Sequence, residues 1–147
     1  MPHNYEWLSR INSVQREFNA MAQAAKCFQQ AASVDPSILE HDVRPRDIAM
    51  ALTRLEATYT IRLFAEFEAG ARQYWAKRKR THPKMSDLLD ALAAIRRISA
   101  LDLHNAHSVR LYRNSLVHER DDYPEIIPLS IARGSLCRFF SKLPSQW

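Results

Sequence analysis

The residues best equipped for chemistry lie in segment 112–119, which holds an arginine, an asparagine and a histidine: Arg113, Asn114 and His118. The guanidinium of Arg113 is always charged and can hold two phosphate oxygens at once. The imidazole of His118 can accept and donate protons near neutral pH. Because an anion-binding group and a proton-transfer group together can break a phosphodiester without a metal, this segment is the candidate active site.

Helical geometry limits how these groups can meet. We expect residues 104–119 to form one helix, on which Asn114 and His118 are four positions apart and share a face. Arg113 is five positions from His118, so an ideal helix separates their directions by about 140°. The two can act on one phosphate only if the helix ends near His118, if the long Arg113 side chain wraps round, or if a symmetric partner supplies one of them.

The pattern Arg113-Asn114-x-x-x-His118 resembles the signature of the HEPN superfamily, an arginine and a histidine separated by four to six residues, in the form with a polar residue after the arginine. Segment 52–72 is also similar to the amphipathic core helix of HEPN domains, and the resemblance covers most of the chain. It implies a dimeric helical bundle that acts as a metal-independent endoribonuclease in prokaryotic defence or toxin–antitoxin systems. A cognate antitoxin protein would then be a second partner.

The resemblance also implies the catalytic roles. The 2′-hydroxyl of RNA attacks its own phosphate, so DNA is not cleaved. His118 moves the proton, Arg113 stabilises the charge that grows on the phosphate oxygens, and Asn114 orients the histidine or the phosphate. A two-fold axis would bring two copies of the motif into one cleft.

Other polar residues accompany the motif on the expected helix. His104, His107 and Arg110 continue the stripe that holds Asn114 and His118, opposite an apolar arc of Val109, Tyr112 and Leu116. We assign His107 and Arg110 to RNA contacts. His104, His107 and His118 are an alternative zinc site, but no acidic or cysteine residue stands at a metalloprotease spacing, so we expect neither metal nor cofactor.

The charge balance favours acidic partners. The net charge is +5 and the isoelectric point about 9.5. The densest basic run holds Lys77, Arg78, Lys79 and Arg80, and we assign it to the RNA backbone, with the neighbouring Tyr74 and Trp75 able to stack on a base. Cations at a helix C-terminus are also favourable without any ligand, so that explanation stays open.

The composition predicts an all-α fold in a single domain, residues 1–147. The two glycines are very few for 147 residues, and glycine is costly inside a helix. A bundle of about five helices is expected, over residues 5–33, 47–78, 86–98, 104–119 and 129–142, with a short piece after Pro36 and an extended connector between Pro124 and Pro128. Without a signal peptide or a membrane-length apolar run, we expect a cytoplasmic protein that does not enter the membrane.

Three alternatives remain open. Arg113 could be a surface ion-pair partner of Glu119 or Asp122, with His118 capping its helix. The domain could keep the motif but serve RNA binding or assembly. It could also be a helical adaptor with no nucleic-acid role.

Overall fold

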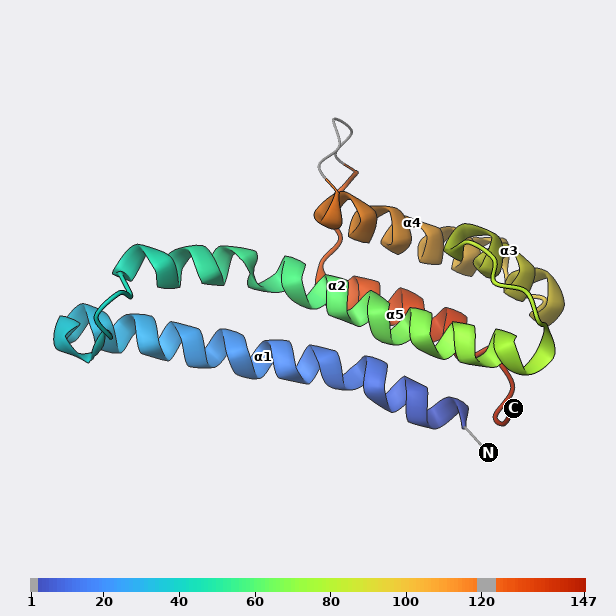
Figure 1. Ribbon diagram of the computed structural model, residues 1–147, viewed down its shortest axis with the longest axis horizontal. Helices are drawn as coiled ribbons and strands as arrows, with labels where there is room; N and C mark the ends of the chain where they lie inside the picture. Colours follow the sequence, from blue (N-terminus) through green and yellow to red (C-terminus); the bar gives the residue numbers. More distant parts are fainter. Residues whose placement is uncertain (1–2, 119–123) are drawn as a thin grey trace.

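The computed structural model describes residues 3–118 and 124–147, and helices dominate both parts (Figure 1). The prediction of an all-α domain with about five helices is confirmed. No β-strand occurs in the described residues, where only His3 and Gln146 form an isolated bridge. The elements are α1 (Asn4–Val34), η1 (Pro36–Ile38, one 3-10 turn), α2 (Pro45–Arg78), α3 (Met85–Arg96), α4 (Ala100–Val117) and α5 (Leu129–Phe140).

Two helix starts differ from the expected ones because of capping. Helix α2 begins at Pro45, two residues early, where the carboxylate of Asp47 accepts a hydrogen bond from the Arg44 N–H at 2.9 Å. Helix α4 begins at Ala100 instead of residue 104. Its N-cap is Ser99, whose hydroxyl accepts from the Asp102 N–H at 3.1 Å, so the loop expected around residues 99–103 is helix from Ala100 on.

Helices α1 and α2 form an antiparallel hairpin whose distal half projects beyond the other helices (Figure 1). In that half, each of the two helices can bury only the side chains that face the other helix. The apolar residues of α1 therefore emerge beyond Val14: Met21 is 48% exposed and Phe28 is 40% exposed. On α2, the apolar residues at three- and four-residue spacing are likewise buried only at Ile48 and from Leu63 onward.

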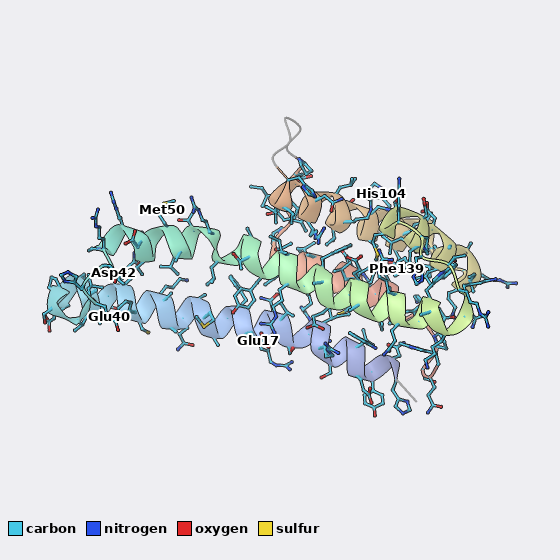
Figure 2. The ribbon with its side chains drawn as sticks, in the orientation of Figure 1. Glu17, Glu40, Asp42, Met50, His104 and Phe139 are labelled. Atoms are coloured by element: carbon cyan, nitrogen blue, oxygen red, sulfur yellow. The ribbon has the colours of Figure 1, made fainter. Side chains whose placement is uncertain are left out.

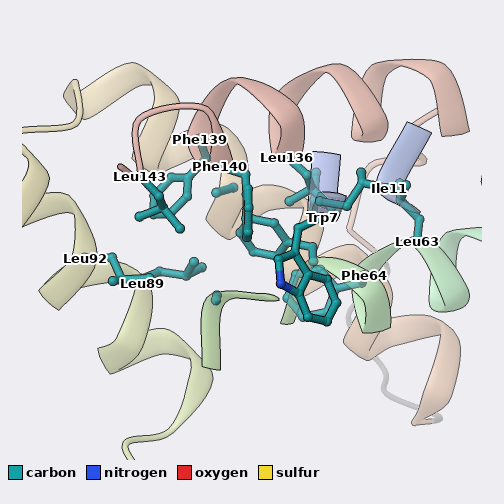
Figure 3. Packing of buried hydrophobic residues seen from close by; sticks show 14 of the residues in the cluster. Trp7, Ile11, Leu63, Phe64, Leu89, Leu92, Leu136, Phe139, Phe140 and Leu143 are labelled. Atoms are coloured by element: carbon teal, nitrogen blue, oxygen red, sulfur yellow. The ribbon is translucent and has the colours of Figure 1, made fainter. Parts of the chain in front are cut away.

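The core lies where the proximal half of the hairpin meets α3, α4 and α5. Figure 3 shows Trp7 and Ile11 of α1 packing with Phe64 of α2 and with Phe139 and Phe140 of α5. Phe67 contacts both phenylalanines of α5 edge to face, with ring centroids 5.8 and 6.1 Å away. Ile95 follows Leu88 and Leu92 at helical spacing but is 40% exposed, because it lies in the last turn of α3, away from the buried face.

Two polar contacts fix α5. The carboxylate of Glu56 accepts a hydrogen bond from the N–H of Leu129 at 2.9 Å, so a negative group of α2 lies at the N-terminus of α5. At the other end, the Asn4 side chain donates to the carbonyl of Leu143 at 2.8 Å and ties the chain termini together.

In neither described part of the chain does a helix have the length and apolarity that crossing a membrane requires.

Candidate functional site

The end of α4 that carries the motif packs against α2 and α5. Val109 and Tyr112 are buried and Leu116 partly so, which confirms the expected apolar arc. Burial raises the pKa of Tyr112, and the negative charge of Glu56 raises it further. Glu56 therefore lies close to both Tyr112 and the start of α5, and the motif rests on a surface made by α2.

Arg113 turns back toward that surface. Its guanidinium carbon lies 5.7 Å from the centroid of the Phe64 ring, and its Nη1 donates to Oδ1 of Asn114 at 3.2 Å. Its Nε is buried and has no hydrogen-bond partner among the described residues. Asn114 therefore holds the arginine, and Nε–H keeps an unused donor.

His118 lies just beyond the helix. Helix α4 ends at Val117, and His118 is its C-cap, with an extended backbone and its N–H bonded to the Asn114 carbonyl at 2.9 Å. The side chain is exposed. Of the three ways in which the arginine and histidine could come together, the first one, a helix that ends near His118, is therefore present. Within residues 3–118 and 124–147, no hydrogen bond connects its ring to Arg113 or Asn114.

The two ion-pair partners proposed for Arg113, Glu119 and Asp122, lie outside the described residues. The capping alternative for His118 is partly realised, because its backbone closes the helix.

The other residues of the polar stripe differ in their surroundings. His107 Nε2 lies 2.8 Å from Oδ1 of Asp90 on α3, and Arg110 Nε donates to His107 Nδ1 at 3.3 Å. With Nδ1 accepting, the neutral ring carries its proton on Nε2 and donates to Asp90. His107 and Arg110 thus connect α4 to α3, while His104 stays exposed (Figure 2).

Among the residues that the structure describes, no three side chains of His, Cys, Asp or Glu gather closely enough to hold a metal ion. The alternative zinc site of His104, His107 and His118 therefore has no geometric support.

The basic run lies far from the motif. Lys77 and Arg78 end α2, and Lys79 caps it through its backbone N–H. Phe64, beneath Arg113, precedes Arg78 by fourteen residues, or about 21 Å of helix. One chain therefore does not bring the basic run beside Arg113.

Both aromatic residues near the basic run make contacts within the protein. Tyr74 is fully buried against the Trp147 ring, so it cannot stack on a base as expected. The indole N–H of Trp75 bonds to Thr81 at 3.1 Å, and its ring packs on the core. All four cations of the run are exposed, so the structure leaves them free to meet an anionic partner: Lys77, Arg78, Lys79 and Arg80.

Sequence reasoning did not identify Phe64 and Glu56 as part of this site. Both lie on α2, and their spacing in sequence shows only an amphipathic helix; nothing local connects them to Arg113 or Tyr112. No protein-family model, curated protein or solved structure matches this chain. The HEPN resemblance therefore rests on the motif and on its all-helical context.

Proposed function

We propose that the protein is a metal-independent endoribonuclease of the HEPN type. One observation carries the proposal: α4 ends immediately before His118, which leaves an exposed imidazole one turn beyond the hydrogen-bonded pair Arg113–Asn114. An exposed proton carrier and a guanidinium held by its neighbours on one segment are the combination that phosphodiester cleavage needs.

The proposed reaction uses the RNA itself as nucleophile. His118 takes the proton of a 2′-hydroxyl, and O2′ attacks the adjacent phosphorus. The bond between phosphorus and O5′ breaks, and the leaving O5′ takes a proton from water, which leaves a 2′,3′-cyclic phosphate and a 5′-hydroxyl. Arg113 stabilises the charge that develops on the phosphate oxygens, while Asn114 keeps the guanidinium in place.

A second copy completes the cleft in this proposal. The surface of α4, the connector and α5 exposes several apolar side chains: Leu111, Val117, Ile126 and Ile131. Ile126 is 77% exposed and Ile131 is 58% exposed, and both line a hollow of about 230 Å³ against Val109. A two-fold axis through this surface would bury these side chains and bring a second His118 toward Arg113. A toxin or defence role, with an acidic antitoxin binding the basic chain, follows from the same resemblance.

The test is cleavage of a labelled RNA oligonucleotide in buffer with EDTA, beside the same sequence in which every sugar is 2′-deoxy. The parent protein should cut only the RNA and leave cyclic-phosphate ends. His118→Ala should lower the rate by about 10²-fold or more, the usual contribution of a general acid–base group. His104→Ala is the matched control, because His104 is exposed on the same helix, and it should cut at the parent rate.

Several results would contradict the proposal: no cleavage by the parent, loss of cleavage in EDTA restored by zinc, or undiminished cleavage by His118→Ala.

The second candidate is a non-catalytic RNA-binding module. The half-buried guanidinium of Arg113 favours it, because contact with Phe64 and Asn114 is also what a structural arginine would make. Salt-sensitive RNA binding without cleavage would select this function, whereas absence of any RNA binding would select the adaptor.

A further inference from the structure

The fold brings together four cationic side chains that the sequence pattern does not connect. Arg96 and Arg97 end α3, while Arg138 and Lys142 lie in the last turn of α5 and just after it. Arg96 Nε donates to the Lys142 carbonyl at 3.0 Å, a contact between residues 46 positions apart. We call these four residues the α3–α5 cluster.

Carboxylate groups neutralise little of the positive charge of this cluster. All four residues are exposed. In the described part of the chain, the only salt bridge that any of them makes joins Arg138 to Asp102, at the long distance of 4.0 Å. Four exposed cations, of which Arg96 is held by a backbone contact and Arg138 alone pairs with a described carboxylate, form a surface of positive potential that attracts anions.

Arg97 adds an independent observation. It is the C-cap of α3, with φ 51°, and in the described residues it is the one non-glycine residue in the left-handed region. This conformation is costly for a side chain with a Cβ, and glycine is the residue that usually closes a helix this way. Neither a hydrogen bond nor a salt bridge in the described chain uses the Arg97 side chain, so closing the helix does not require an arginine.

We propose that the α3–α5 cluster binds the phosphate backbone of RNA. The inference rests on the proposed endoribonuclease function and adds a substrate-binding surface to it. It is distinct in sequence from the basic run 77–80, and the first turns of α3 between the two carry Asp87 and Asp90. The cluster lies near the start of α4, about 27 Å from His118 at the other end of that helix, so an RNA that reaches both would span several nucleotides.

The experiment measures binding of a labelled 20-nucleotide RNA by fluorescence anisotropy at several salt concentrations. All proteins carry His118→Ala, so that the RNA stays intact. Arg97→Gln with Arg138→Gln is compared with Arg16→Gln and Arg54→Gln, two exposed arginines on the projecting half of the hairpin. Both pairs remove two positive charges, so they differ only in where the charges were.

The cluster pair should weaken binding at least tenfold at 0.15 M salt. It should also reduce the slope of log K against log salt by about 1.4, since each contact with single-stranded RNA contributes about 0.7. The hairpin pair should change binding less than threefold. Equal weakening by both pairs, or none by the cluster pair, would overturn the inference.

A single substitution gives a second readout. Arg97→Gly should raise Tm by a few degrees, because it relieves the left-handed conformation, and should still weaken RNA binding. A fall in Tm would make Arg97 a structural residue and overturn its assigned role.

The two proposals fail separately. If the parent protein cleaves RNA, and the cluster pair made without His118→Ala cleaves it at the same rate and with the same affinity, this inference alone is overturned. Cluster-dependent RNA binding without any cleavage would remove the endoribonuclease alone.

Discussion

Replacing Gly70 by alanine should destabilise the protein, although alanine is the better helix former. Gly70 lies in α2 where α1 and α5 press against it, and a Cβ there would lie 2.8 Å from two atoms of the Phe140 ring and 2.9 Å from the Trp7 ring. Both rings are buried and cannot withdraw. The gain in helix propensity is about 1 kcal/mol, and overpacking a core usually costs about 1–3 kcal/mol. With three contacts under 3.0 Å we expect the upper part of that range, hence a net loss of about 1–2 kcal/mol.

The chain supplies a matched control in its other glycine. Gly134 lies inside α5, and a Cβ there would meet nothing within 4 Å, so Gly134→Ala should stabilise the fold by about 0.5–1 kcal/mol. Urea denaturation followed by circular dichroism measures both changes. If Gly70→Ala is as stable as the parent or more so, the close packing of α2 against Trp7 and Phe140 is refuted.

Two further predictions concern pH and assembly. Burial raises the pKa of Tyr112 and of the Cys137 thiol, opposed for the thiol by Arg133. Both groups therefore stay neutral in the folded state at pH values where they ionise in the unfolded chain. The stability that they contribute to the fold is fully present below pH 9 and is lost as pH rises through their folded pKa values. Tyr112→Phe with Cys137→Ala should therefore flatten the alkaline fall of the unfolding free energy, and an unchanged pH slope between 9 and 10.5 would contradict this. For assembly, mixing Arg113→Gln with His118→Ala should restore about a quarter of the parent cleavage rate if each site takes its arginine and histidine from different chains of a two-fold dimer; no recovery would mean that each site lies within one chain.

The helices were predictable because their signal is local. The three- and four-residue spacing from Leu63 to Tyr74 depends only on one helix facing one core, and that stretch is buried as expected. Burial farther out was not predictable from spacing. Met21 and Phe28 continue the same pattern along α1, yet they are exposed because no third helix covers the projecting half of the hairpin. Whether an apolar stripe is covered depends on what packs on it, which the stripe itself does not encode.

The site shows the same limit at the level of single side chains. The sequence placed Arg113, Asn114 and His118 on one segment, but an ideal helix would have kept the first and last apart. Two features that lie outside that segment's periodicity decide where these groups lie: α4 ends at Val117, so His118 leaves the helix, and Phe64 of α2 lies beneath the guanidinium. Contact with Phe64 fixes Arg113, whereas His118 leaves the helix in extended conformation with an exposed ring. A guanidinium held against Phe64 and an exposed imidazole suit the proposed site, which closes only when RNA, or a second copy of the chain, is present. Replacing the guanidinium should therefore affect stability and cleavage together, while replacing the imidazole should affect cleavage alone.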